Sequence, residues 1–398
     1  MATRRSDEPS SQGTKKTPKG GNYISEWFGY RIFPAVSDAP AMVAVQRERR
    51  CPFLSASTGE FRECIKAETS KGVCSISTIT ATRQDDWLVC PYRAVQPDLL
   101  EAAARRLFDV APGMTVLIAS APSLEKTEVR AGIKGALKSD QRAFVFFQDK
   151  LGGEISLPRT DRSPELAFDI TLVEIKQEGD ELHIGQYGIL EVQTMDFHGT
   201  YRHAVQNLTD ALRLHDIGFP AEVSRNHQWL SDNMEGPNIA NVFKRTFYQM
   251  AFKFQMGLDK ACAGCVLAIS ESVWLSWQRH LGAPSLTPAE DGSFLLRKPR
   301  PQLPPAIGPE VPASSRIELS QPTGELASPA WIYVFEFDTG SDVSPNRLAI
   351  TKQILTDAHS LAYFALDVAP TAAVASAAEV IRVSLIRKLS KLWPLVVS

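Results

Sequence analysis

Acidic and amide side chains recur at short spacing in the middle of the chain, in two stretches that are typical of β-strands. Asp169 lies in the first stretch, and Glu191 and Gln193 lie two residues apart in the second. Side chains two apart on a strand share a face, so Asp169 on a partner strand can meet both of them. Oxygen ligands that converge in this way hold Mg²⁺, which helps water to cleave a phosphodiester.

Glu191 and Gln193 have a simpler interpretation as the solvent-facing half of an ordinary amphipathic strand. Taken alone, the spacing favours that interpretation. Against it, Ile189, Leu190 and Val192 make the strand apolar on both faces near its end. A carboxylate among such neighbours is costly unless it is paired or bound to a metal.

The cysteines form a second candidate site. Cys51, Cys64, Cys74 and Cys90 lie within forty residues, separated by twelve, nine and fifteen residues. Four soft ligands suit a closed tetrahedral metal site, but paired C-x₂-C knuckles are missing, so four separately buried thiols fit nearly as well. Cys262 and Cys265 form a lone C-x₂-C pair, which we expect to be buried thiols.

Bulk composition limits the class of protein. The chain has 398 residues, 44% of them hydrophobic, and a net charge of -2, so binding to nucleic acid must come from local patches. No apolar run is long enough to span a membrane. Residues 1–20 read as a flexible basic tail without a secretory signal, so we expect a cytoplasmic, soluble protein with reduced cysteines.

Alternating strand and helix patterns surround the acidic residues. Strands are predicted at 115–119 and 143–147, with a helix near 125–138 between them. Two further strands, 168–174 and 183–194, form a predicted hairpin around a polar turn at 178–181. The remaining predicted elements are helices at 97–108, 201–214, 238–256 and 272–280, strands at 264–269 and 331–337, and a C-terminal helix with an apolar stripe at Ile381, Leu385, Ile386, Leu389 and Leu392. These elements predict an α/β protein with a mixed sheet flanked by helices.

Composition shifts divide the chain into five predicted segments. After the tail, residues 21–95 read as a small irregular module that a cysteine-bound metal would brace. Residues 96–285 form the main core, and residues 286–330 form a proline-rich loop or insertion. Residues 331–398 supply the C-terminal strand and helices that complete the core.

Longer stretches carry a family resemblance. They include GNYISEWFGYRIFP from Gly21, CIKAETSKGVC from Cys64 and FQDKLGGEIS from Phe147, followed by SPELAFDITL, YGILEVQTMDFHGTYRHAV, MEGPNIANVFKRTFYQMAFKF, SVWLSWQRHL and WIYVFEFD. In this order, over roughly two-thirds of the chain, they resemble the NotI family of type II restriction endonucleases.

The resemblance implies a homodimeric nuclease with a PD-(D/E)xK-type core and a small N-terminal metal module built on four cysteines. It implies that Asp169 and Glu191 bind the catalytic Mg²⁺, that Gln193 occupies the lysine position, and that Glu154 is an additional acidic partner. Glu165 is a weaker candidate. An amide cannot accept a proton at useful pH, so Gln193 can only position water. It also implies that the four N-terminal cysteines bind one structural Fe or Zn ion.

The expected function is hydrolysis of both strands of duplex DNA at a specific GC-rich palindrome by metal-activated water. Alternatives are a non-catalytic, sequence-specific DNA-binding protein on the same scaffold, and a repair or structure-specific nuclease. The expected partners are double-stranded DNA, a second copy of the chain and a cognate DNA methyltransferase that acts in the same restriction-modification system without stable binding.

Several further residues are assigned by type and position. We expect bases to be read by cations of the cysteine module, namely Arg49, Arg50, Lys66 and Lys71. Lys244 and Arg245 are candidates for contact with phosphate or with the partner subunit. His198 is expected to be a core histidine, and Asp196 is left without a role.

Overall fold

The computed structural model describes residues 20–161, 165–232, 234–299, 328–338 and 345–393. The predicted tail, residues 1–20, lies outside this part of the chain apart from Gly20. Of the predicted proline-rich insertion, residues 300–327 also lie outside it.

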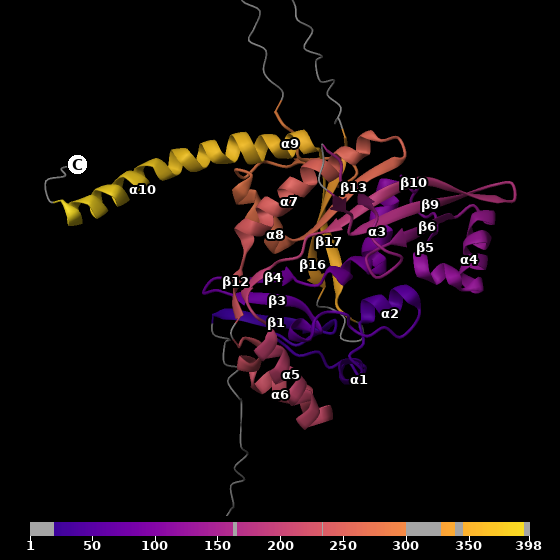
Figure 1. Ribbon diagram of the computed structural model, residues 1–398, viewed down its shortest axis with the longest axis horizontal. Coiled ribbons are helices and arrows are strands. Elements are labelled where there is room, and N and C mark those ends of the chain that lie inside the picture. Colours follow the sequence, from indigo (N-terminus) through magenta and orange to yellow (C-terminus); the bar gives the residue numbers. More distant parts are fainter. Residues whose placement is uncertain (1–19, 162–164, 233, 300–327, 339–344, 394–398) are drawn as a thin grey trace, which may run out of the picture.

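A nine-stranded sheet forms the centre of the molecule (Figure 1). Its strand order is β14-β15-β17-β16-β13-β10-β9-β6-β5, with both parallel and antiparallel neighbours. The strands are β5 (Val116–Ser120), β6 (Arg142–Phe147), β9 (Ile170–Glu178), β10 (Glu181–Val192), β13 (Cys262–Ser270), β14 (Thr287–Pro288), β15 (Phe294–Leu295), β16 (Ala330–Asp338) and β17 (Arg347–Thr356). The prediction of a mixed sheet is confirmed.

Helices cover both faces of this sheet. Helix α3 (Pro97–Leu107) packs on one face through Leu99, Leu100 and Ala103, which its 3.6-residue period brings to one side. The opposite face carries α7 (Ile239–Lys253), α8 (Glu271–His280) and α9 (Ala358–Tyr363), and α4 (Thr127–Lys138) packs against β5 and β6. The α/β fold class with a mixed sheet flanked by helices is therefore confirmed.

The predicted hairpin positions the acidic residues. Strands β9 and β10 pair antiparallel, and the register that pairs Leu190 with Ile170 places Glu191 opposite Asp169, just before β9 begins. Leu190 and Ile170 point into the core beside α3, so their neighbours Glu191 and Asp169 point to the α7 face. The alternation of the two strands thus brings both carboxylates to the same side of the sheet.

The N-terminal region has more regular structure than the expected irregular module. It contains an antiparallel sheet in the order β2-β1-β3-β4, with β1 (Gly21–Trp27), β2 (Tyr30–Arg31), β3 (Val73–Ile79) and β4 (Gln84–Leu88), and two short helices, α1 (Met42–Arg47) and α2 (Pro52–Thr58). Its buried residues form one cluster with the α3 face of the central sheet. Hydrophobic burial therefore supports this region directly.

A buried polar network fastens the N-terminal sheet to the rest of the chain. The fully buried guanidinium of Arg93 donates to Glu26 at 2.9 Å, and the side-chain amide of Asn346 donates to the other Glu26 oxygen at 2.8 Å. The Arg93 guanidinium also lies over the ring of Phe53, 4.6 Å from its centroid. These contacts join β1, the segment after β4 and the start of β17.

The remaining helices lie at the periphery. Helices α5 (Arg202–His215) and α6 (Phe219–Arg225) pack beside the N-terminal sheet, next to a ribbon of β11 (Phe197–Gly199) and β12 (Met234–Pro237). Strands β7 (Ser156–Leu157) and β8 (Leu166–Ala167) form a second ribbon. Short 3₁₀ turns span Glu68–Ser70, Pro91–Val95, Ala121–Glu125, Asp216–Gly218, His227–Leu230 and Phe254–Leu258.

The C-terminal helix differs from its predicted role of completing the core. After a π-helical turn (Phe364–Val368), α10 (Ala369–Leu392) projects away from the body (Figure 1), and Ile381, Leu385, Leu389 and Leu392 are exposed. Its apolar stripe therefore contributes nothing to the central core. Within the described ranges, no helix combines the length and hydropathy needed to cross a membrane.

Candidate functional site

A cleft of about 250 Å³ lies between the end of β10 and α7. Asp169, Glu191 and Gln193 line it from the sheet, and Arg245 and Thr246 line it from α7. Its remaining lining residues are Val192, Thr194, Gln249, Met250 and Leu267. The structure thus brings together the three residues that the sequence predicted would converge.

Backbone hydrogen bonds fix the two carboxylates. The Asp169 N–H donates to Glu191 Oε1 at 3.2 Å, and the Val192 N–H donates to Asp169 Oδ2 at 2.9 Å. The Glu191 carboxylate is therefore held by the backbone of Asp169, and the Asp169 carboxylate is held by the backbone of Val192, the residue after Glu191. This reciprocal arrangement keeps both groups aimed into one cleft.

Burial makes the negative charge of the cleft costly. Glu191 is only 4% exposed, and burial, followed by repulsion from Asp169, raises the pKa of Glu191 to about 8. Burial also raises the pKa of Asp169, against the lowering effects of the Val192 N–H, Lys253 and Arg245. Two acids with raised pKa values in one cleft are a typical feature of functional sites.

Gln193 is tied to its neighbours. Its side-chain oxygen accepts a hydrogen bond from the Thr246 hydroxyl of α7, and its side-chain nitrogen donates to the Thr194 carbonyl. Both ends of the amide are thus engaged within the protein. Gln193 therefore lines the cleft, and its hydrogen bond with Thr246 also links the end of β10 to α7.

Lys253 is the residue of this site that sequence reasoning missed. Its ammonium donates to Glu191 Oε2 at 2.5 Å, and both side chains are almost fully buried. Lys253 belongs to the inward face of α7 together with Val242, Thr246 and Met250. The sequence did carry one signal for it, a lysine within the apolar stripe of a helix. An unpaired ammonium there would be costly, so such a lysine indicates a buried acidic partner.

Glu154 lies at the edge of the site. It is exposed and does not line the cleft, yet Asp169 is among the charges that raise its pKa, after burial and Asp149. The preceding Gly152 and Gly153 have φ angles of 94° and 89°, which favour glycine and turn the chain after β6. Glu165, the weaker candidate, is exposed and is not part of the cleft lining.

The expectation for His198 was wrong. His198 is exposed, because β11 lies in a two-stranded ribbon outside the main sheet. The nearby Asp196 forms an ion pair with Arg245 at 3.1 Å, with both side chains about half exposed. Arg245 thus lies at the mouth of the cleft, while Lys244 is exposed beside it on α7.

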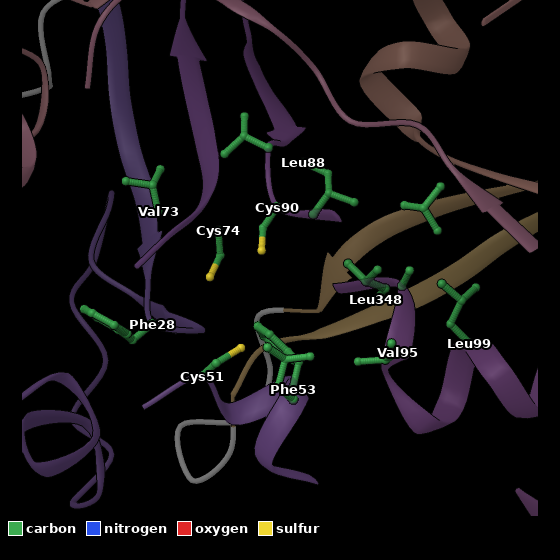
Figure 2. Close-up of a cluster of buried hydrophobic side chains, with 14 of the residues drawn as sticks. Phe28, Cys51, Phe53, Val73, Cys74, Leu88, Cys90, Val95, Leu99 and Leu348 are labelled. Carbon is green, nitrogen blue, oxygen red and sulfur yellow. The ribbon is translucent and has the colours of Figure 1, made fainter. Parts of the chain in front are cut away.

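The four N-terminal cysteines come together although they belong to separate elements. All four are buried with free thiols, and Figure 2 shows the sulfur atoms of Cys51, Cys74 and Cys90 pointing into a common space. The Cys64 sulfur accepts a hydrogen bond from the Gly72 N–H at 3.4 Å. Cys262 and Cys265 are buried elsewhere, as predicted.

One thiol of this group is poised to ionise. A hydrogen bond from Cys74 lowers the pKa of Cys90 to about 6, with further lowering by Lys66 and Arg93. Burial, followed by repulsion from Cys90, raises the pKa of Cys51 to about 12. Thiolates are the metal-binding form of cysteine, so the donor chemistry fits a soft or borderline metal ion such as Fe or Zn.

Neither site has the spacing of a closed metal site. Over the part of the chain that the structure describes, no three His, Cys, Asp or Glu side chains are arranged to hold a metal ion. The chemistry of the donors still differs between the two places. The cleft offers hard carboxylate oxygens, which suit Mg²⁺, and the cysteine group offers soft sulfur ligands.

A larger cavity of about 790 Å³ separates the N-terminal sheet from α5. Its cations are Arg47, Arg49, Lys71, Arg202 and Arg213, and its acids are Glu68 and Asp216. Thr69 lines both this cavity and a hollow that includes Asp196, the ion-pair partner of Arg245. The hollow therefore adjoins the basic cavity at Thr69, and the Asp196–Arg245 ion pair links its lining to that of the carboxylate cleft.

Two of the four predicted base readers, Arg49 and Lys71, line the basic cavity. Arg50 lies over the ring of Phe61, 5.1 Å from its centroid. The Lys66 ammonium instead donates to the carbonyls of Val73 and Val89, at 2.7 and 3.2 Å. These inward bonds beside the thiols contradict the prediction that Lys66 reads DNA.

Comparison with known proteins adds no family to these observations. No protein-family model matches the chain, and no curated protein matches it either.

Proposed function

We propose that the protein is a Mg²⁺-dependent endonuclease that cuts both strands of duplex DNA at a specific palindromic site. The observation that carries the proposal is the shared cleft, into which Asp169 and Glu191 point from neighbouring strands. The resemblance of the sequence to the NotI family of type II restriction endonucleases agrees with this geometry.

Residues of the chain fit the needs of phosphodiester hydrolysis. Asp169 and Glu191 would hold Mg²⁺, since both are fixed by backbone hydrogen bonds and a divalent cation would stabilise their charged forms, which burial and mutual repulsion make costly. When bound, Mg²⁺ supplies a nucleophilic water at neutral pH and neutralises charge on the phosphoryl oxygens. Glu154 adds negative charge at the rim, and Gln193 fixes the distance between β10 and α7.

The pattern of strands supports assignment to the PD-(D/E)xK class of nucleases. In that class an Asp and a Glu-x-Lys pair lie on adjacent strands, as Asp169 and the pair Glu191 and Gln193 do here. The gathered thiols of Cys51, Cys64, Cys74 and Cys90 support one structural Fe or Zn ion per chain.

Arginine and lysine side chains of the basic cavity offer a surface for DNA. We expect Arg202 and Arg213 of α5 to contact phosphates, because they line the basic cavity together with three further cations. Arg49 and Lys71, which pair with Glu68 and line the same cavity, are the residues that we expect to contact base edges. Two copies of the chain would present the cleft to both strands, which a palindrome requires.

Digestion of a genome of known sequence, followed by mapping of the cut ends, tests the proposal. We expect discrete ends at a GC-rich palindrome with Mg²⁺ and none with EDTA. Asp169→Ala and Glu191→Ala should bind the same DNA without cutting it, whereas Glu165→Ala should cut normally. Sequence-specific binding without cleavage by the native protein would favour the alternative of a non-catalytic DNA-binding protein.

A further inference from the structure

The strand that carries Glu191 lacks a cation of its own. At the position two residues later stands Gln193, whose amide is neutral and is engaged at both ends by Thr246 and Thr194. A neutral amide cannot offset the charge of two carboxylates and an entering phosphate. Charge balance in the cleft must therefore come from another element.

Helix α7 provides a buried ammonium at this place. Lys253 Nζ lies 2.5 Å from Glu191 Oε2, and the Lys253 side chain is 3% exposed. The ammonium also lowers the pKa of Asp169 and Glu154, so its field reaches all three acids of the site. Lys253 thus contacts one acid of the site directly and acts on the other two through its charge.

Packing alone does not account for this lysine. The surrounding face of α7 is filled by Val242 and Met250, and the Phe168 ring centroid lies 5.9 Å from Nζ. Replacing a buried ion pair by apolar groups is often neutral or stabilising, so an apolar residue would serve the fold at least as well. The ammonium is explained by the acids that it faces.

We propose that Lys253 is the positioning residue that takes the place of the missing strand lysine. Its ammonium holds Glu191 in the orientation that faces the cleft and offsets part of the negative charge when a scissile phosphate enters. The role of Lys253 in cleavage rests on the proposed nuclease function, while its coupling to the carboxylates does not.

Two readouts on the full chain test this role. We expect Lys253→Met to bind Mn²⁺ about tenfold more tightly without DNA, measured by electron paramagnetic resonance, because a positive charge beside the carboxylates repels the metal. The same variant should cleave DNA about 10²–10³-fold more slowly with Mg²⁺ in single turnover, because a fixed charge near the phosphate is lost. Lys253→Arg should restore part of the rate.

Lys260→Met is a matched control, since Lys260 is exposed and lies seven residues further along the chain. It should change neither Mn²⁺ affinity nor cleavage. Native-like cleavage by Lys253→Met would overturn the proposal, as would a joint fall in Mn²⁺ affinity, cleavage and Tm. If Lys253→Met does not fold, Lys253→Gln and Lys253→Arg supply the same comparison.

The metal readout separates this inference from the proposed function. If the native protein binds Mn²⁺ but cuts no DNA, the nuclease proposal fails. Tighter Mn²⁺ binding by Lys253→Met would then still support the coupling between the ammonium and the carboxylates. Unchanged affinity would refute it.

Discussion

Replacing Asp169 with asparagine should make the metal-free protein more stable while it abolishes cleavage. In the native protein, burial and then the Asp169 carboxylate raise the pKa of Glu191 to about 8. Asparagine keeps the size of the side chain and can still accept the Val192 N–H. The substitution therefore removes one charge and little else.

The size of the gain follows from the strand geometry. Opposite side chains on neighbouring antiparallel strands have Cβ atoms about 5 Å apart. Two unit charges at that distance repel by about 3 kcal/mol at an effective dielectric constant of about 20. Because the Lys253 ammonium offsets part of this repulsion, we expect Asp169→Asn to gain about 1–2 kcal/mol of unfolding free energy. The corresponding rise in Tm is about 1–2 °C for a chain of this length.

The gain should depend on pH. The folded-state pKa of Glu191 lies above its ordinary value of 4.5, so the native state keeps this proton to higher pH than the unfolded state does. Native stability therefore falls as pH rises from about 4.5 to about 8. In Asp169→Asn the neutral side chain no longer raises the pKa of Glu191, so the loss of stability with rising pH is smaller than in the native protein. The Tm difference should grow from about pH 5 to about pH 8.

Thermal denaturation in EDTA, followed by circular dichroism across this pH range, measures the effect. Glu165→Gln is the matched control, because Glu165 is an exposed carboxylate four residues before Asp169. It should leave Tm unchanged within error. A Tm for Asp169→Asn that equals or falls below the native value at every pH would refute the electrostatic reasoning.

Three further predictions concern the N-terminal region and the basic cavity. Cys90→Ser should lose the bound Fe or Zn, about one per chain by elemental analysis, whereas Cys262→Ser should keep it. Arg93→Met should cost about 3–5 kcal/mol of unfolding free energy in urea, because it strands the buried Glu26 carboxylate. Arg62→Met, which breaks the ion pair with Glu60 in which both side chains are about half exposed, should cost less than about 1 kcal/mol. Arg202→Ala should weaken DNA binding and reduce the slope of log affinity against log salt by about 1, measured by fluorescence anisotropy.

Elements with a clear period were predictable from the sequence. Helix α3 and the β9–β10 hairpin appear within four residues of their expected bounds, because their apolar residues repeat at helical or strand spacing. The convergence of Asp169 and Glu191 follows from the same alternation. Strand β17 was missed, and so was the pairing of Phe294 and Leu295 with it, because long-range sheet partners leave little local signal.

Lys253 shows why part of the site could not be predicted. It lies 62 residues from Glu191 along the chain, and only the packing of α7 against the sheet brings the two together. The same holds for Lys66, whose basic side chain suggested DNA contact until the carbonyls of Val73 and Val89 were seen to hold it. The sequence shows that a side chain is charged, but the partner of that side chain is set by tertiary packing.

Crystals soaked in Mn²⁺ and measured for anomalous scattering give the most direct test of the central claim. The account predicts a peak in the cleft within bonding distance of both the Asp169 and the Glu191 carboxylates, and the loss of that peak in Asp169→Ala crystals. A Mn²⁺ ion bound at full occupancy elsewhere, with none between these two carboxylates, would contradict it.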